Sequence, residues 1–240
     1  MSDNLGKITI ARRFCGPPES GNGGYVAGLL GNFFDGPAEV TLRLPPPLEV
    51  EMNAVRTESG VVCLMHEGEI VAEAISTEFE LDVPAPPSFA ESEQASLRFD
   101  GFHQHTFPGC FVCGPERNAS DGLRVFAGRV AENGLHAAPW VPHASLADAE
   151  GATKAEFIWA ALDCPGAFSL GMPERPVVLG RLAVKIIARP QAGKKCVVTG
   201  WQIGGEGRKF RAGTSLFDED GKMCAVSRAT WIALKTAPSS

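Results

Sequence analysis

The chain of 240 residues lacks several features that mark other classes of protein. It has 22 lysine and arginine residues against 28 aspartate and glutamate residues, and the resulting net charge of −6 argues against nucleic acid or an anionic membrane surface as the main partner. No apolar run is long enough to span a bilayer, and Met1-Ser2-Asp3-Asn4 does not begin a signal peptide. The dinucleotide-binding, Walker and nucleophile-elbow motifs are missing, so nucleotide cofactors and serine-hydrolase chemistry have no support.

Cysteine is present, but not in the pattern of a disulfide framework. The number of cysteines is odd and they are scattered along the chain, mostly in apolar strand-like or helix-like surroundings: Cys15, Cys63, Cys110, Cys113, Cys164, Cys196 and Cys224. We therefore expect reduced thiols in the core and a cytoplasmic location.

The 18 prolines and 27 glycines predict many turns and a β-rich fold. The pattern of strand, helix and then a run of long strands occurs twice. In the first half we expect strands at 7–14, 38–44, 49–57, 61–66 and 69–81 and a helix at 24–34. In the second half we expect strands at 122–130, 135–141, 177–188, 195–203, 209–217 and 222–233 and a helix at 153–170.

An internal echo supports a duplicated domain. Glu67-Gly68 and Asp220-Gly221 are acidic-glycine pairs, which favour hairpin turns, and each precedes a similar strand-like run. We predict an N-terminal unit over 1–83, a linker with a Cys-x-x-Cys segment over 84–121, and a C-terminal unit over 122–240.

The two predicted helices differ in the chemistry that they offer. The first begins with Asn22-Gly23-Gly24, where backbone amides at a helix start favour developing negative charge. The second carries Asp163 inside an otherwise apolar stretch, and a lone buried carboxylate is costly unless it has a partner or a function. Each helix supplies what the other lacks.

Three stretches resemble the hotdog-fold thioesterases in a double-hotdog arrangement. Asn22-Gly23-Gly24 resembles the helix-start motif of this family. The segment Ala160-Ala161-Leu162-Asp163 is similar to the helix that carries the catalytic carboxylate. Cys110-Phe111-Val112-Cys113-Gly114-Pro115, followed by Asp121-Gly122-Leu123-Arg124, resembles the lead-in to a first strand. The resemblance implies an α+β fold of two long helices, each wrapped by an antiparallel sheet, with the halves paired into one continuous sheet.

The chain departs from the family pattern in ways that predict one composite site. In a single hotdog an acid follows Gly-Gly by about two turns on the same helix, but here Gly31 and Asn32 stand near that place. Ala155 and Glu156 replace Gly-Gly in the second half. The resemblance therefore implies one complete site, with amides from the first half and the acid from the second. The Asp-Thr-Gln triad of longer double-hotdog acyl-CoA thioesterases is not carried over, because threonine is absent from Leu179-Gly180-Arg181-Leu182 and glutamine is absent from Arg228-Ala229-Thr230.

The resemblance implies hydrolysis of acyl-CoA thioesters. Asp163 would act as a general base or nucleophile, the amides of Gly23 and Gly24 would stabilise the oxyanion, and Asn22 would orient the carbonyl or the water. We expect no resident cofactor, because coenzyme A enters as part of the substrate. We also expect no metal in this catalytic site.

Three further expectations concern the surroundings of the site. The basic cluster Arg208, Lys209 and Arg211 is a candidate for gripping the phosphates of coenzyme A. Apolar strand faces at 61–65 and 197–203 are candidates for an acyl channel. A homo-oligomer is possible through outward pairing of edge strands.

Alternatives remain open at this stage. Asn22 is also a favoured helix cap, Asp163 can be structural because Pro165 disrupts the helix there, and the basic cluster can be a solvated strand end. A non-catalytic double hotdog that binds acyl-CoA, a hotdog enoyl-CoA hydratase or dehydratase, and a zinc module are rival functions. The zinc module would be built on His103, His105, Cys110 and Cys113, and the hydratase would require a histidine beside Asp163.

Overall fold

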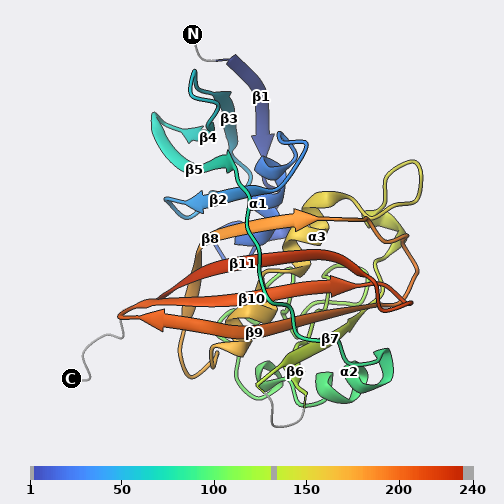
Figure 1. Ribbon diagram of the computed structural model, residues 1–240. Helices are drawn as coiled ribbons and strands as arrows, with labels where there is room; N and C mark the ends of the chain where they lie inside the picture. The colour runs from blue at the N-terminus through green and yellow to red at the C-terminus, as the bar shows by residue number, and fades with distance from the viewer. Residues whose placement is uncertain (1–2, 131–133, 235–240) are drawn as a thin grey trace, which may run out of the picture.

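One antiparallel sheet organises the chain. A computed structural model describes residues 3–130 and 134–234. Within that part, the strands follow the order β1-β3-β4-β5-β2-β8-β11-β10-β9-β7-β6 (Figure 1). The strands are β1 (Asp3–Thr9), β2 (Ala38–Leu42), β3 (Glu51–Arg56), β4 (Val62–His66), β5 (Glu69–Ser76), β6 (Gly128–Arg129), β7 (His136–Trp140), β8 (Val177–Ile186), β9 (Cys196–Glu206), β10 (Lys209–Phe217) and β11 (Met223–Ala233). The helices are α1 (Gly23–Gly31), α2 (Phe89–Ser96), α3 (Ala155–Ala161) and α4 (Cys164–Ser169), with 3-10 turns at Arg12–Phe14, Asp100–Phe102 and Ala144–Leu146.

The sheet consists of two sets of strands that meet at β2 and β8. Helix α1 packs on β2 and β5 of the first five strands, helix α4 packs on β7, β9 and β10 of the last six, and α3 packs against α1. Strand β2 pairs with β8 from Ala38↔Val184 to Thr41↔Arg181, so the sheet continues from one half into the other. In Figure 1 helices α1 and α3 lie behind this sheet. The predicted α+β double hotdog with a continuous sheet is thereby confirmed.

Turn chemistry sets the hairpin register, as the acidic-glycine pairs predicted. Glu67 and Gly68 connect β4 to β5 with φ angles of 48° and 85°. Two successive residues with positive φ define the turn whose twist matches paired strands. Gly221, with a φ of 75°, serves the turn between β10 and β11. Both acidic-glycine pairs therefore lie in hairpin turns, as the internal similarity of the sequence predicts.

Four predicted elements differ in the structure, and the first of them is the strand expected over 69–81, which ends at Ser76. The helix expected over 153–170 is two helices, α3 and α4, because Pro165 lacks an N–H and its ring disfavours the preceding helical turn. The strand expected over 122–130 is regular only at β6. Arg124 there has a φ of 55°, and the segment instead hydrogen-bonds to the backbone of Phe111 and Val112. The strand expected over 7–14 ends at Thr9 and continues as a 3-10 turn.

The segment between the halves is structured. Residues 77–88 cross the front of the sheet in Figure 1, where Phe79 packs on Ala183 and Val226. Helix α2 then begins with a capping box formed by Ser88 and Glu91, and it packs against β7. The boundaries 1–83, 84–121 and 122–240 stay a prediction.

Helices α1 and α3 pack closely because glycine lines the contact. A Cβ atom at Gly28 would lie 2.6 Å from the Cα atom of Glu156, and one at Gly24 would lie 2.6 Å from the Cβ atom of Asp163. Such distances are below van der Waals contact, so a larger residue would push the helices apart. The glycines thus bring the start of α1 against the break between α3 and α4, where the candidate site lies.

Candidate active site

The structure brings Asn22, Gly24 and Asp163 together. The Nδ2 atom of Asn22 donates a hydrogen bond of 2.8 Å to Oδ2 of Asp163, and the Gly24 amide donates one of 3.0 Å to the same oxygen. Asn22 is 2% exposed and Asp163 is 3% exposed, so the contact is shielded from bulk water. One half of the chain therefore supplies two donors to a carboxylate from the other half.

Local structure explains how Asn22 serves two partners. Asn22 is the N-cap of α1, with an extended backbone, and its Oδ1 atom accepts the Tyr25 amide at 2.9 Å. This is the usual N-cap bond, which satisfies one of the free amides at a helix start. Capping uses the oxygen of the side chain and leaves the Nδ2 atom free for Asp163. The capping interpretation and a role in the site are therefore compatible.

Asp163 lies at the break between α3 and α4, which presents its side chain to α1. The helix cannot continue regularly into Pro165, and the Leu162 carbonyl accepts a hydrogen bond of 2.7 Å from the Thr214 hydroxyl. A backbone group released from a helix ladder needs such a partner when it is buried. The break is therefore a stable local structure, and Asp163 does not cap α4 through its side chain.

The protein environment of Asp163 favours the protonated, neutral carboxyl group more strongly than bulk water does. The pKa of Asp163 is raised to about 7, chiefly because burial disfavours the charged form. The hydrogen bonds from Gly24 and Asn22 oppose the rise, and the negative charge of a Cys110 thiolate contributes to it. Its Oδ1 atom is buried and has no hydrogen-bond partner among the described residues. A carboxylate with one oxygen held and the other free is suited to exchange a proton near neutral pH.

The two glycine amides are not equivalent. The Gly24 amide is committed to Asp163, whereas the Gly23 amide donates to no acceptor within residues 3–130 and 134–234. Gly23 lines the cavity described next, together with Asn22 and Asp163. The Gly23 amide is therefore the donor that remains available for an oxyanion.

A cavity of about 670 Å³ opens beside these residues. Its wall is mostly apolar and includes Leu42, Phe107, Met172, Val177, Leu179 and Trp231. Both halves contribute, since β2 and the start of α1 face β8, α4 and β11 across it. A mostly apolar cavity with few polar groups at one place is the usual form of a small-molecule site.

The basic cluster predicted from the sequence lies apart from this wall. Arg208 donates to the Ala233 carbonyl through Nε at 3.0 Å and through a terminal nitrogen at 2.8 Å, while Lys209 and Arg211 are exposed on the β9–β10 hairpin. None of the three lines the cavity, although Leu234, the neighbour of Ala233, does. The segments 61–65 and 197–203, expected to line an acyl channel, do not line it either, because their buried side chains pack into the core.

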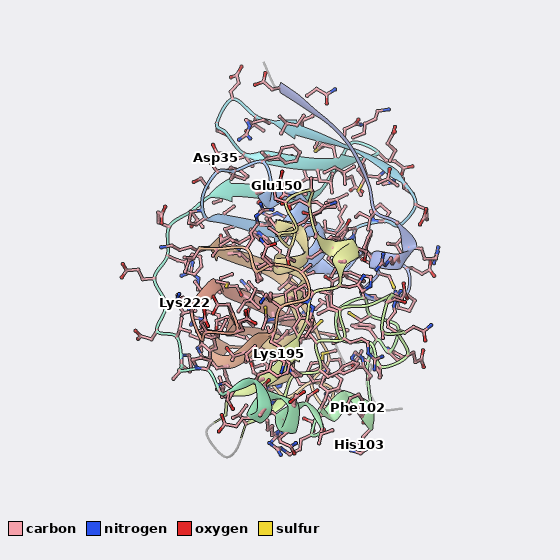
Figure 2. All side chains as sticks on the ribbon, turned by 90° about the vertical axis from the view of Figure 1, so that its right-hand side faces the viewer. Asp35, Phe102, His103, Glu150, Lys195 and Lys222 are labelled. Carbon is pink, nitrogen blue, oxygen red and sulfur yellow. The ribbon has the colours of Figure 1, made fainter. Side chains whose placement is uncertain are left out.

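Sequence reasoning singled out His105, Cys110 and Cys113 as candidate zinc ligands but did not predict that they line a cavity, and it did not single out Cys164. His105, Cys110, Cys113 and Cys164 line the cavity, and Cys110 Sγ lies 3.8 Å from Asn22 Nδ2. The position of Cys164 directly after Asp163 is a signal that was available in the sequence. His103, by contrast, is exposed and lies at the outer edge of the molecule beside Phe102 (Figure 2).

His105 bears on the hydratase alternative because it supplies the cavity with an imidazole. Its Nδ1 atom accepts the Phe107 amide at 3.0 Å, and burial lowers its pKa. It comes from the segment between the halves and not from a helix, so it differs from the helix-borne histidine that the alternative would require.

Comparisons with known proteins support the fold. No protein-family model matches the chain, and no curated protein matches it. Among solved structures, the tesB protein of Mycobacterium avium subspecies paratuberculosis is 11% identical with a TM-score of 0.62, and the match covers 98% of this chain and 96% of that one. Acyl-CoA thioesterase II TesB2 of Mycobacterium marinum is 11% identical with a TM-score of 0.61, over 100% of this chain and 98% of that one.

A third solved structure, a conserved protein with a hot dog fold from Alicyclobacillus acidocaldarius, is 12% identical with a TM-score of 0.58, over 96% of this chain and 93% of that one. These nearly full-length matches show that the chain has the architecture of a double hotdog. Among the described residues, no helix is both long and apolar enough to cross a membrane.

Proposed function

We propose that this chain hydrolyses acyl-CoA thioesters at one composite site between its two halves. The observation that supports this most is the buried contact between Asp163 and the donors Asn22 and Gly24, at the wall of an apolar cavity. Hydrolysis requires a base, a hydrogen-bond donor for the oxyanion and an apolar pocket for the acyl group, and the cavity offers candidates for each.

In the proposed mechanism, Asp163 acts as a general base through Oδ1. The bonds from Asn22 and Gly24 hold Oδ2, so the side chain cannot rotate freely and Oδ1 is the oxygen that accepts a proton. A water that reaches Asp163 from the cavity gives up its proton to the carboxylate and attacks the thioester carbon. The developing oxyanion accepts the Gly23 N–H, and its collapse expels the thiolate, which takes the proton back from Asp163. One donor of this kind is worth about 10²–10³ in rate.

The chemistry of the cavity favours an apolar acyl group. Charged side chains are few on its wall, and those of Glu19 and Arg43 belong to surface loops, where Arg43 is paired with Glu73. An apolar chain loses contact with water as it enters, which favours binding by about 25 cal/mol per Å² of buried area. Arg208, Lys209 and Arg211 remain the proposed contacts for the phosphates of coenzyme A outside the cavity.

The proposal is tested with purified wild type and Asp163→Ala on a series of saturated acyl-CoAs, by measuring the released thiol. We expect turnover by the wild type and a near-background rate for the variant. Equal, near-background rates in both proteins would instead favour the non-catalytic binding protein. An enoyl-CoA is assayed alongside, and loss of its double bond without thiol release would favour the hydratase.

A further inference from the structure

Three cysteines that the proposed reaction does not use form a cluster beside Asp163. Cys110 and Cys113 come from the segment between the halves, and Cys164 is the first residue of α4. Their sulfur atoms all lie within 4.8 Å of one another, and all three residues are buried. Among the described residues, these three side chains form a group whose potential ligand atoms lie close enough together to bind one metal ion.

The spacing of the sulfur atoms fits ligands around one ion. The Sγ atoms of Cys110 and Cys164 are 3.8 Å apart. Two thiolates at about 2.3 Å from a tetrahedral zinc ion are separated by about 3.8 Å. A disulfide bond would require about 2.05 Å, so this pair is reduced and is spaced as two ligands would be.

The backbone around Cys110 and Cys113 is folded into a tight turn that directs both thiols inward. The Gly114 amide donates to the Cys110 carbonyl at 2.8 Å, and a Cβ atom at Gly114 would lie 2.5 Å from that oxygen, so the turn requires glycine. A Cys-x-x-Cys spacing on such a turn is typical of zinc ligands.

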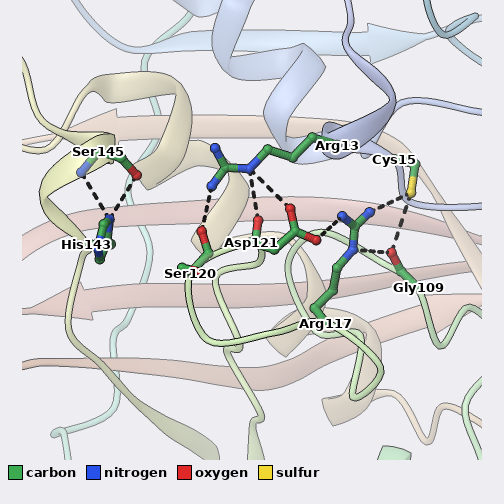
Figure 3. A network of polar contacts seen from close by, with 8 residues as sticks. All are labelled: Arg13, Cys15, Gly109, Arg117, Ser120, Asp121, His143 and Ser145. Atoms are coloured by element: carbon green, nitrogen blue, oxygen red, sulfur yellow. Dashed lines mark hydrogen bonds and ion pairs between the residues drawn. The ribbon is translucent and has the colours of Figure 1, made fainter.

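Arginine side chains hold this turn in place from outside the cluster (Figure 3). Arg117 donates to the Gly109 carbonyl at 2.7 Å and to the Cys15 sulfur at 2.9 Å, and it pairs with Asp121 at 2.6 Å. Arg13 donates to the Asp121 carbonyl at 3.0 Å. The ligand-bearing segment is therefore fixed by polar contacts within itself and to Arg13 and Cys15, which precede α1, and this is the preorganisation that a binding site needs.

We propose that Cys110, Cys113 and Cys164 bind a thiophilic divalent metal ion of the zinc class. The three thiols lose their protons to solvent as the ion binds, and the adjoining cavity supplies a water as the fourth ligand. The ion ties the segment between the halves to α4, one residue after Asp163. This differs from the zinc set suggested by the sequence, since Cys164 joins the two cysteines and His103 is exposed elsewhere.

Metal content of the purified full chain tests the proposal. The reduced protein is loaded with zinc, freed of excess ion by gel filtration and analysed by atomic emission. We expect one zinc ion per chain in the wild type, and charge-transfer absorption from thiolate ligands when cobalt replaces zinc. Retention of much less than one zinc ion per chain by the folded wild type would overturn the proposal. Zinc uptake that occurs only when the protein is unfolded would also overturn it.

Matched variants locate the site. Cys164→Ser is expected to weaken zinc binding by more than about tenfold in competition with a chromophoric chelator. Cys196→Ser and Cys224→Ser, which change equally buried thiols on β9 and β11, are expected to bind like the wild type. Equal affinity in Cys164→Ser and Cys196→Ser would show that the ion binds elsewhere.

A second measurement protects the test against a variant that does not fold. Zinc, but not magnesium, is expected to raise the Tm of the wild type in a concentration-dependent way, because an ion that binds only the folded state stabilises it. An unchanged Tm at saturating zinc would overturn the proposal. Metal content and Tm are independent of turnover, so failure here is distinct from failure of the proposed hydrolysis.

Discussion

The two ends of the α1–α3 helix pair carry the same kind of contact in different surroundings. At the closed end, Nδ2 of Asn22 donates to Oδ2 of Asp163 at 2.8 Å, and both residues are buried. At the open end, Nδ2 of Asn32 donates to Oε2 of Glu156 at 3.1 Å, where Asn32 is exposed to solvent. Each contact joins an amide of α1 to a carboxylate of the second half.

The difference between the ends shows what burial adds to a carboxylate. The closed end has a second donor, a cavity and a pKa raised to about 7 by desolvation. Neither Asn32 nor Glu156 lines the cavity, and the space beside Gly28 is taken by Glu156, whose Cα atom would lie 2.6 Å from a Cβ atom at Gly28. An exposed amide–carboxylate contact contributes little, because water competes for both groups. We therefore propose that only the closed end is functional.

The largest contrast is expected from neutralising the two carboxylates one at a time. Asp163→Asn should lower kcat/KM for acyl-CoA hydrolysis by about 10²–10⁴-fold, the usual contribution of a general base. Glu156→Gln is the matched change at the open end and should leave kcat/KM within about twofold of the wild type. Initial rates of thiol release at low substrate concentration measure both. Similar losses in the two variants would mean that the ends are not functionally different.

The next contrast concerns the glycines that let the helices approach. Gly28→Ala places a methyl group 2.6 Å from the Glu156 Cα atom, so the helices must separate. We expect a loss of about 1–3 kcal/mol in the free energy of unfolding, measured by urea denaturation. Gly36→Ala is the control, because a Cβ atom there meets nothing within 4 Å. Equal stability of these two variants would contradict the close-packing argument.

The sequence predicted the composite pairing but not the geometry that makes it possible. Asn22 and Asp163 were found because their residue types stand out in glycine-rich and apolar surroundings. The commitment of the Gly24 amide to Asp163, and hence the distinct position of Gly23, depends on how two helices pack, which no local pattern encodes. Cys164 was overlooked for the same reason, since its partners are 51 and 54 residues away in the sequence, at Cys113 and Cys110.

The fold could be predicted more fully than the site for a related reason. Long alternating strands and acidic-glycine turns are local signals, and they located β2 to β5 and β7 to β11. The segment 122–130 failed this test because its backbone partners, Phe111 and Val112, lie in an irregular loop. Similarly, the cavity wall draws on β2, α4, β8 and β11, which become neighbours only through the sheet order.

A smaller contrast is expected between the two asparagines. Asn22→Ala removes the cap of α1 and one donor to a buried carboxylate, so it should cost about 1–2 kcal/mol of unfolding free energy. Asn32→Ala removes only an exposed contact and should cost less than about 0.5 kcal/mol. Thermal unfolding monitored by circular dichroism compares them. A larger loss in the Asn32 variant would reverse the assignment of the closed and open ends.

The smallest expected effect is a shift along the pH axis, and it separates the role of Asn22 in tuning the carboxylate from its role in capping the helix. The ionised carboxylate is the base, so kcat/KM of the wild type should rise with pH through a midpoint near 7 and level off above it. Asn22 donates to the charged form and lowers the pKa, so Asn22→Ala should move the midpoint to higher pH. Asn22→Asp keeps a capping oxygen but puts a second acid beside Asp163, and like charge should move the midpoint higher still. Asn32→Asp is the matched change at the open end and should leave the midpoint where it is. If all four profiles share one midpoint, a group other than Asp163 controls the rate, and the closed end is a structural contact like the open one.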